Sequence, residues 1–338
     1  MPLSSDGERG QKSLLGEGGS MRLAWFTHRY FPAIGGAETY GREMVRRFLA
    51  AGHEVDVVTS DALDLWYFTD PAARRVEAPR LSELDGARVL RFPVRHVPLQ
   101  RYLGRLLSYA PHWPTRCRFE SFMPIIPGIE RVRGAYDAVF GVGFPYTIFS
   151  LAGLRTARAA GAPLVLTPFL HLATQGDPVN RLYSRAHQAR LLAQSQTVVV
   201  QTELENLAVV SLGIPRSRVF TLGMGVDQAE VTGGDRLRLR SRLGIPAECA
   251  VIGQLGVNDP NKGTNDLVNA VACLNARRPD DDQIHLILGG ASTPAFQSFA
   301  AALPGACQRW LHMLGPVTPR DRPNFYSALD VFAMPSRT

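Results

Sequence analysis

Two adjacent glycines near the start of the chain could hold a phosphate. Gly35 and Gly36 lie between a strand-like run over residues 22–27 and a helical pattern over residues 37–51. Glycines at such a turn leave no Cβ between the backbone N–H groups and a ligand. The helix that follows directs its unpaired N–H groups and its positive dipole end at the same place. The pair therefore predicts a site for a phosphate or sugar diphosphate, although a tight turn without a ligand would also need glycine.

Polar side chains follow two other strand-like runs. His171 closes the run Thr167-Pro-Phe-Leu-His, and Lys262 follows a run over residues 250–255 that contains Gln254. In open α/β sheets, ligands bind at the carboxyl ends of the strands, so we expect His171 to project from such an edge. A lone histidine also serves packing, and this alternative stays open for His171.

The elements that position these residues alternate between strand and helix from residue 21 onward. This order indicates a mainly parallel sheet with helices on both faces. A glycine-rich stretch at residues 231–234 interrupts the alternation, which then resumes. We therefore expect two α/β domains with a boundary near residues 228–234 and a ligand-binding cleft between them.

Apolar periodicity gives the expected bounds of these elements. Strands are predicted at residues 22–27, 54–59, 87–92, 136–142, 163–167, 197–201, 218–222, 250–255, 283–288, 310–314 and 331–334. Helices are predicted at residues 37–51, 146–160, 179–193, 203–212, 235–243, 263–277, 295–303 and 320–329.

Composition limits the classes of protein that fit. Of the 338 residues, 45% are hydrophobic and 20% are charged, which is typical of a globular protein with a sizeable core. The four cysteines show no CxxC or Cys/His spacing, so we expect reduced thiols in the cytoplasm and no metal site. No apolar run is long enough to predict a membrane span. The net charge of +7 favours anionic partners, but no nucleic-acid-binding motif accompanies it.

A basic stretch over residues 86–119 stands out. It holds seven arginines and no acidic residue, interleaved with leucine and aromatic side chains. Such a segment can lie in a lipid headgroup layer, so Arg101, Arg105 and Trp113 are candidates for contact with an anionic membrane surface. The alternative is a solvated basic face whose arginine stems cover the core.

The first 20 residues are rich in glycine, serine and charge and lack the apolar segment of a secretory signal. We expect a disordered leader without a function of its own. Met1 and Met21 are both candidate start residues.

Five motifs occur in a characteristic order. They are Pro32-Ala-Ile-Gly-Gly-Ala-Glu38, Thr167-Pro-Phe-Leu-His171, Thr221-Leu-Gly-Met-Gly-Val-Asp227, the pair Gln254 and Lys262-Gly263, and Ala328-Leu-Asp-Val-Phe-Ala-Met-Pro-Ser-Arg-Thr338. The order resembles the retaining glycosyltransferases of family 4, which have the GT-B fold. The resemblance covers nearly all of residues 21–338.

This resemblance implies two Rossmann-like domains that face a cleft. Residues 1–20 would be the leader, residues 21–228 the N-terminal domain on the acceptor side, and residues 229–338 a partial C-terminal domain that binds the nucleotide sugar. The reaction would transfer a sugar from a UDP- or GDP-sugar to a glycan or lipid-linked acceptor with retention of configuration. The family needs no metal, and we expect no cofactor. We expect a cytoplasmic protein, with peripheral contact at the inner membrane face as a further candidate.

On the donor side, the resemblance places Gly35 and Gly36 against the diphosphate and the transferred sugar. Lys262 matches the family's lysine that neutralises the leaving nucleoside diphosphate. Gln254 stands where the family commonly has arginine; it donates hydrogen bonds but brings no charge, so more of the leaving-group stabilisation falls to Lys262 and helix N-termini.

On the acceptor side, His171 resembles the family's active-site histidine, which contacts the transferred sugar. Glu38 would contact the acceptor or hold the start of its helix. Asp227 matches a hinge segment and is expected to fix the linker more than to act in catalysis.

The chain departs from the family at its end. The family continues after the Pro-Ser-Arg segment with a region that contributes two glutamates to the donor site, whereas this chain stops at Thr338. We therefore expect a second domain with an unpaired sheet edge and exposed apolar surface, and little or no transferase activity of the chain alone.

Two other functions remain as alternatives. The missing glutamates and Gln254 would suit a catalytically impaired fragment or a non-catalytic protein that binds sugar nucleotides or glycans. A dinucleotide-dependent epimerase or dehydrogenase would need a G-x-G-x-x-G turn after the first strand, and the chain has Ala33-Ile-Gly-Gly-Ala-Glu38 there.

Overall fold

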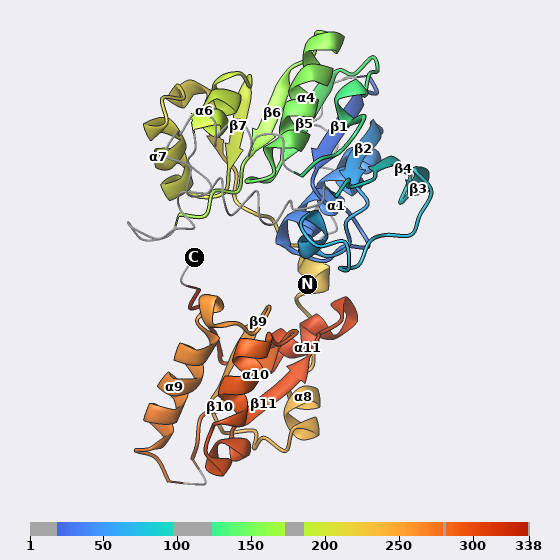
Figure 1. Ribbon diagram of the computed structural model, residues 1–338. Coiled ribbons are helices and arrows are strands. Elements are labelled where there is room, and N and C mark those ends of the chain that lie inside the picture. Colours follow the sequence, from blue (N-terminus) through green and yellow to red (C-terminus); the bar gives the residue numbers. More distant parts are fainter. Residues whose placement is uncertain (1–18, 97–123, 173–185, 280–281, 337–338) are drawn as a thin grey trace, which may run out of the picture. The chain divides into compact units, whose positions relative to one another are not determined.

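The computed structural model describes residues 19–96, 124–172, 186–279 and 282–336, and the statements below refer to these ranges. The chain forms two compact units, Met1–Met224 (unit 1) and Gly225–Thr338 (unit 2). Each unit contains a largely parallel sheet with helices packed on it (Figure 1). The predicted α/β architecture with two Rossmann-like sheets is therefore confirmed.

The sheet of unit 1 has eight strands in the order β3-β4-β2-β1-β5-β6-β7-β8. The strands are β1 (Arg22–Thr27), β2 (Glu54–Ser60), β3 (Leu81–Leu84), β4 (Ala87–Phe92), β5 (Ala138–Val142), β6 (Leu164–Thr167), β7 (Thr197–Val200) and β8 (Val219–Thr221). All neighbours are parallel except β3 and β4, which form an antiparallel hairpin. The hairpin turn is Asp85-Gly86, with φ angles of 53° and 88°. An Asp-Gly pair is a strong signal for such a turn, and the sequence analysis overlooked it.

Strand β1 lies in the middle of this sheet because both of its faces are apolar. Leu23 and Trp25 pack in the cluster that includes Val45 of helix α1, whereas Ala24 and Phe26 pack in the cluster on the opposite face. A strand buried on both faces reads as a continuous apolar run, as residues 22–27 do.

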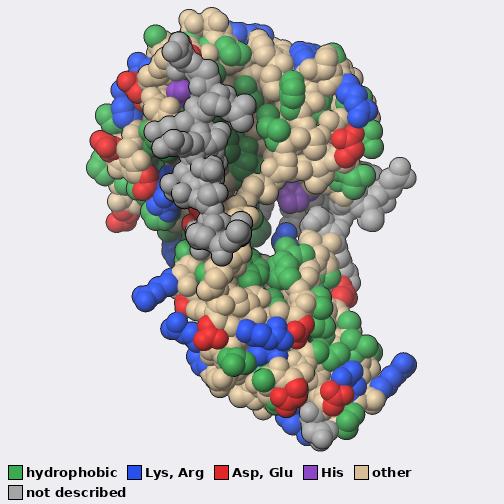
Figure 2. Space-filling model, turned by 180° about the vertical axis from the view of Figure 1, so that it is seen from behind, with side chains coloured by type: hydrophobic (Ala, Val, Ile, Leu, Met, Phe, Trp, Pro, Cys, Tyr) green, Lys and Arg blue, Asp and Glu red, His purple; other side chains and the backbone are tan. Residues whose placement is uncertain are grey.

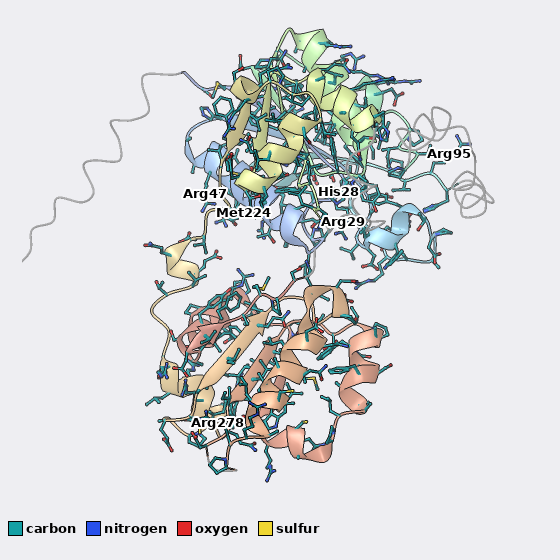
Figure 3. The ribbon with its side chains drawn as sticks, turned by 90° about the vertical axis from the view of Figure 1, so that its left-hand side faces the viewer. His28, Arg29, Arg47, Arg95, Met224 and Arg278 are labelled. Atoms are coloured by element: carbon teal, nitrogen blue, oxygen red, sulfur yellow. The ribbon has the colours of Figure 1, made fainter. Side chains whose placement is uncertain are left out.

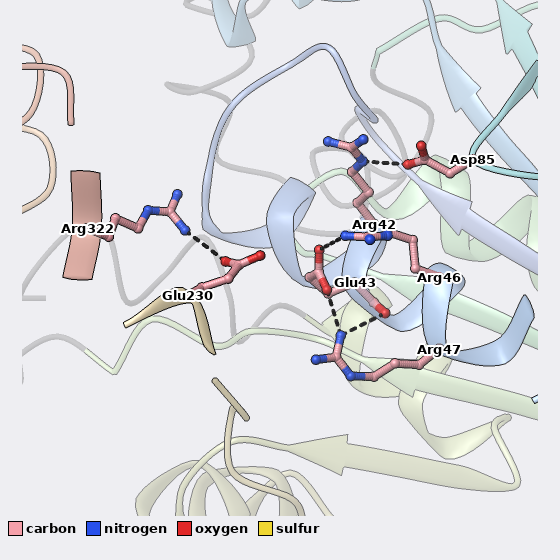
Figure 4. A network of polar contacts seen from close by, with 7 residues as sticks. All are labelled: Arg42, Glu43, Arg46, Arg47, Asp85, Glu230 and Arg322. Atoms are coloured by element: carbon pink, nitrogen blue, oxygen red, sulfur yellow. Dashed lines mark hydrogen bonds and ion pairs between the residues drawn. The ribbon is translucent and has the colours of Figure 1, made fainter. Parts of the chain in front are cut away.

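The helices of unit 1 are α1 (Gly36–Ala50), α4 (Thr147–Ala160), α6 (Ala186–Ala193) and α7 (Glu203–Ser211), with short 3-10 turns η1 (Leu65–Phe68), η2 (Ile129–Arg131) and η3 (Arg216–Arg218). Gly52, at φ 88°, follows the end of α1, where a left-handed glycine commonly ends a helix. On the exposed face of α1, Glu43 pairs with Arg46 and Arg47, and Arg42 pairs with Asp85 of the hairpin turn at 2.7 Å (Figure 4). The last pair ties α1 to the edge of the sheet.

Unit 2 has four parallel strands in the order β11-β10-β9-β12. They are β9 (Val251–Leu255), β10 (His285–Gly289), β11 (Leu311–Gly315) and β12 (Val331–Phe332). Its helices are α8 (Arg236–Arg242), α9 (Thr264–Asn275), α10 (Pro294–Ala301) and α11 (Arg322–Ser327), with 3-10 turns η4 (Gln228–Glu230), η5 (Pro260–Lys262), η6 (Gly305–Arg309) and η7 (Pro319–Asp321). The sheet ends at β12, whose Val331 and Phe332 are 54% and 45% exposed, so it has the apolar edge that the sequence predicts.

Both faces of the unit 2 sheet are covered. Val268 of α9 and Phe296 of α10 belong to the core on one face, and Leu239 of α8 and Phe325 of α11 belong to the core on the other. Arg322 of α11 also pairs with Glu230 of η4 at 3.4 Å (Figure 4). Unit 2 thus has its own core on each side of its sheet.

The distribution of surface charge and the length of the helices are relevant to the predicted membrane contact. Basic and acidic side chains are interspersed over the face of unit 2 drawn in Figure 2, so the net positive charge forms no single patch there. Among the described residues, no helix is both long and apolar enough to cross a membrane.

Candidate functional site

Each sheet has one topological switch point, where successive strands are added on opposite sides of the first strand. Ligands of open α/β sheets bind beside such points, at the carboxyl ends of the strands. In unit 1 this point lies between β1 and β5, because β2 and β4 follow on one side of β1 and β5 to β8 on the other. In unit 2 it lies between β9 and β12. The topology therefore selects one candidate edge in each unit.

In unit 1, a buried carboxylate joins the end of β1 to the start of α1. Glu38, in the first turn of α1, forms ion pairs through Oε1 with His28 Nε2 at 3.3 Å and with Arg29 Nη2 at 2.7 Å. Figure 3 shows His28 and Arg29 next to each other at the end of β1. Arg29 Nη1 also donates to the carbonyl of Leu63 at 2.9 Å, so one guanidinium ties the loops after β1 and β2 together.

His28, at the end of β1, is buried next to the end of β5. A Cβ built on Gly143, which follows β5 at φ 85°, would lie 3.1 Å from His28 Nδ1. That nitrogen is buried and has no hydrogen-bond partner among the described residues. The sequence analysis named Glu38 but neither His28 nor Arg29; their place directly after the first strand was the signal that could have identified them.

Gly35→Ala is expected to destabilise unit 1, and Gly36→Ala is expected to leave it unchanged. A Cβ built on Gly35 would overlap Glu38 Oε2, whereas one built on Gly36 would meet nothing within 4 Å. Forcing the carboxylate aside should cost about 1–3 kcal/mol, typical of overpacking a buried site. Urea unfolding of the two matched variants measures this cost, and equal midpoints would contradict the described position of Glu38.

Glu38 should also make unit 1 less stable in acid. Burial favours the neutral carboxyl, but the hydrogen bond from His28 and the charges of His28 and Arg29 outweigh it and lower the pKa from 4.5 to about 2. A depressed carboxyl pKa contributes stability that is complete above pH 4.5 and is lost as the pH falls through about 2. The shift corresponds to on the order of 3 kcal/mol.

Urea unfolding of the wild type and Glu38→Gln at pH 6 and pH 3 checks this expectation. The stability difference between the two proteins should shrink at pH 3, because the unfolded carboxyl is then largely protonated. A difference that stays constant over this range would show that the carboxylate is not stabilised by its partners.

His171 is half-buried and lies four residues beyond the carboxyl end of β6. Phe169, two residues before it, has a φ of 52°, a left-handed conformation that is rare for a bulky residue and is often found at functional sites. The Phe169 ring meets Tyr40 of α1 edge-on, with 5.2 Å between the ring centroids. The structure therefore brings the His171 loop against the helix that starts at the glycine pair.

Glu205 fixes this loop, and the sequence analysis did not name it. Its buried Oε1 accepts from Leu170 N and its Oε2 from Gln201 N, both at 2.8 Å. Burial raises the pKa of Glu205, while the hydrogen bonds from Gln201 and Leu170 oppose the rise. The T-x-x-E spacing of Thr202 and Glu205, a capping box, was the signal for it, although the carboxylate reaches beyond the cap to the neighbouring loop.

In unit 2, Gln254 and Lys262 come together at the switch point. The fully buried Gln254 side chain donates from Nε2 to Thr264 Oγ1 at 3.1 Å and to the Lys262 carbonyl at 3.4 Å. Gly263, at φ 68°, separates η5 from α9, and a Cβ there would overlap the Pro335 carbonyl after β12. Two of the five motifs, the pair Gln254 and Lys262-Gly263 and the segment that contains Pro335, therefore meet at this edge.

This edge offers donors and one buried acceptor. Helix α9 begins here with Thr264, so its first N–H groups lie beside Lys262, which is the one lysine in the described part of the chain. Asp259 Oδ1 accepts from Asn261 N at 2.8 Å and fixes the turn that carries Lys262. Gln254 Oε1 is buried without a partner among the described residues. A cation and a helix N-terminus on one fixed turn suit an anionic group.

The remaining site residues that the sequence predicts are Asp227 and members of the basic stretch. Asp227 is exposed, and its carbonyl accepts from Glu230 N at 3.0 Å in the segment that begins unit 2. Arg101, Arg105 and Trp113 lie outside the described residues. Gly35, Gly36, Glu38 and His171 belong to unit 1, whereas Gln254 and Lys262 belong to unit 2. In the described ranges, no group of histidine, cysteine and carboxylate side chains could hold a metal ion.

Comparison with known sequences bears on this arrangement. Residues 35–225 match the model of the glycosyl transferase 4-like domain. D-inositol 3-phosphate glycosyltransferase of Stackebrandtia nassauensis is 26% identical over 324 residues, which are 89% of this chain and 66% of that protein. The same enzyme of Pseudarthrobacter chlorophenolicus is 26% identical over 322 residues, 89% of this chain and 69% of that protein. The chain thus spans about two thirds of the length of these relatives.

Solved structures share the fold. Sucrose-phosphate synthase from Thermosynechococcus elongatus superposes with a TM-score of 0.62 at 18% identity, over 94% of this chain and 76% of that one. Anabaena HepE in complex with UDP and glucose gives 0.58 at 18% identity, over 93% and 74%. The matched domain covers more than half of the chain and runs from the glycine pair to the first residue of unit 2. The chain therefore belongs to the glycosyl transferase 4-like domain family and has the two Rossmann-like sheets of the GT-B glycosyltransferase fold.

Proposed function

We propose that the protein is a retaining glycosyltransferase that takes a sugar from a UDP- or GDP-sugar and transfers it to a glycan or lipid-linked acceptor. The observation that carries the proposal is the meeting of Lys262, Gln254 and the start of α9 at the switch point in unit 2. Anabaena HepE, whose fold the chain shares, is described in complex with UDP and glucose, which supports a nucleotide-sugar donor.

On the donor side, departure of the nucleoside diphosphate builds negative charge on its terminal phosphate. The Lys262 ammonium and the first N–H groups of α9 would stabilise this charge, since both are fixed before the reaction. The backbone N–H groups at Gly35 and Gly36 would add hydrogen bonds to the diphosphate. No step of this scheme needs a metal ion, and we propose none.

On the acceptor side, His171 would contact the transferred sugar. Its loop is held by Glu205 and packs against α1, so the imidazole has a defined position. The role of Glu38 is to hold the glycine loop through Arg29 and His28, because its carboxylate is buried in those ion pairs. Asp227 would fix the linker between the two units.

Gln254 supports a second candidate, a non-catalytic protein that binds sugar nucleotides or glycans. Its amide group donates within the turn of unit 2 and brings no charge to a leaving phosphate. Such a protein would bind the donor without releasing its nucleoside diphosphate.

A thermal-shift panel of UDP-, GDP- and ADP-sugars, followed by an assay of nucleoside diphosphate release, separates these outcomes. The enzyme predicts a raised melting temperature with one nucleotide class, release of that diphosphate, and a product whose anomeric configuration, read by NMR, matches the donor. Stabilisation without release would favour the binding protein. No shift with any of the three classes would overturn both the transferase and a protein that binds sugar nucleotides.

A further inference from the structure

One exposed aromatic side chain lies near the candidate site of unit 1 and has no role in the scheme above. Trp66, in the turn η1 that follows β2, is 76% exposed. The other tryptophans of the described ranges, Trp25 and Trp310, are 1% and 3% exposed. Tryptophan has the largest apolar side chain and is enriched where proteins make contacts, so the exposed ring of Trp66 is a candidate binding surface.

The backbone at Trp66 is held by hydrogen bonds and by the burial of the residues that follow it. Its own carbonyl accepts from Thr69 N at 2.9 Å and from Asp70 N at 2.8 Å. The next two residues, Tyr67 and Phe68, are buried in the core of unit 1. An exposed side chain on so rigid a support loses little freedom when it binds, which is the pattern of a preorganised contact surface.

Neighbouring side chains anchor the same turn. Asp64, which precedes it, accepts from Arg74 Nε and Nη2, both at 2.9 Å. His96 Nε2 bonds the Tyr67 carbonyl at 2.5 Å, and the two rings meet edge-on. The turn is therefore held in place by side chains of the segments on either side of it.

The turn is also coupled to the candidate site. Arg29 donates to the Leu63 carbonyl, three residues before Trp66, and the same guanidinium pairs with Glu38 at the start of α1. The loop after β2 is thereby attached to the glycine loop through one side chain. Trp66 consequently belongs to the same carboxyl edge as the groups proposed to meet the transferred sugar.

The charge around the turn argues against a membrane surface. Residues 60–75 contain three aspartates and two arginines, and Arg74 is paired with Asp64, so the turn carries no excess of positive charge, whereas binding to anionic lipid needs a cluster of basic side chains. A hexopyranose ring fits better, because the negative face of an aromatic ring attracts the weakly positive C–H groups of a sugar face. The hydroxyl rim of the ring would remain available to polar neighbours.

We propose that Trp66 is a stacking platform for a hexopyranose ring of the acceptor and so determines acceptor specificity. This inference rests on the proposed function, because it names the acceptor's chemistry at the site of unit 1. Stacking on Trp66 would hold the acceptor sugar at the carboxyl edge and leave the donor site of unit 2 unaffected.

Binding of methyl and octyl β-glycosides of glucose and galactose to the full chain tests the platform through tryptophan fluorescence. Both the methyl and octyl forms of one sugar should quench the exposed emission of Trp66, and Trp66→Ala should lose this quenching. Trp66→Phe should retain weaker binding, since phenylalanine keeps an aromatic face, and it should be followed by calorimetry. The neighbouring Leu65→Ala, also exposed, is the matched control and should bind as the wild type does.

Four outcomes would overturn the platform. Binding of octyl glycosides alone would assign Trp66 to an alkyl chain, and a fluorescence change with phosphatidylglycerol vesicles but with no glycoside would assign it to a membrane. Unchanged glycoside binding in Trp66→Ala would remove it from the site altogether. UDP and GDP binding is measured on the same proteins: nucleotide binding without glycoside binding contradicts the platform alone, whereas loss of both contradicts the proposed function.

In the nucleoside diphosphate release assay, Trp66→Ala should raise the KM for the acceptor at least tenfold and leave acceptor-independent release unchanged.

Discussion

Arg240→Ala is expected to lower the free energy of unfolding of unit 2 by about 3–5 kcal/mol, because each buried carbonyl left without its donor costs about 1–3 kcal/mol. The Arg240 side chain is fully buried and uses all of its nitrogens. Nε donates to the Ala328 carbonyl at 2.9 Å, Nη1 to the carbonyls of Ala247 and Cys249, and Nη2 to Asp330 Oδ2 at 2.8 Å. Alanine would remove this donor from three carbonyls and would take one of several donors from Asp330.

Asp330, the residue before β12, is the carboxylate of the Arg240 network. It also accepts from Arg236 and from Val251 N, and although burial favours its neutral form, these contacts and Arg240 lower its pKa to about 2. Arg242→Ala is the control, since this arginine lies on the same helix and is exposed. Denaturant unfolding of both variants measures the difference. A loss no larger in Arg240→Ala than in Arg242→Ala would contradict the described network.

Lys262→Ala is expected to weaken binding of the donor's nucleoside diphosphate by about 10- to 100-fold, since a hydrogen bond to a charged group contributes about 1.5–3 kcal/mol. Where turnover is measurable, loss of a fixed donor to the leaving group should lower kcat by about 10²–10³-fold. Titration calorimetry with UDP and GDP measures the first effect, and nucleoside diphosphate release measures the second.

Two variants make the Lys262 result specific. Lys262→Arg keeps the charge and should retain most of the binding, with a smaller loss because arginine places its charge differently. Arg277→Ala removes an exposed positive charge beyond the other end of α9 and should bind as the wild type does. Equal weakening by Lys262→Ala and Arg277→Ala would mean that only the overall charge matters, and the site would have to lie elsewhere.

The sequence was sufficient for the elements whose two faces are both buried. Residues 22–27 are a strand with the predicted bounds, because a parallel strand between two helical layers leaves a nearly continuous apolar run. Residues 87–92 also have the predicted bounds, with Arg88 and Arg91 among their apolar residues. Strand β3 was missed, since Leu81–Leu84 alternates between exposed and half-buried positions and leaves little apolar signal. The bounds of α11 were set too wide because Pro323 restricts its start and the last residues before β12 form a turn.

The candidate site was only partly accessible to sequence reasoning. Glycine pairs and a lysine after a strand are local signals, so Gly35, Gly36 and Lys262 could be named. The ion pairs of His28 and Arg29 with Glu38, and the reach of Glu205 to Leu170, depend on which loops meet at one sheet edge, and strand order decides that. The predicted contacts of Arg101, Arg105 and Trp113 with a membrane lie outside the described residues and stay predictions.

The central claim is that a nucleoside diphosphate binds at the carboxyl edge of the unit 2 sheet, beside Lys262. Hydrogen exchange of the full chain, mapped by mass spectrometry with and without the nucleotide sugar that gives a thermal shift, tests it most directly. The account predicts slower exchange over residues 254–266, where Gln254, the η5 turn and the first turn of α9 meet. Protection confined to unit 1, or none at saturating nucleotide sugar, would contradict it.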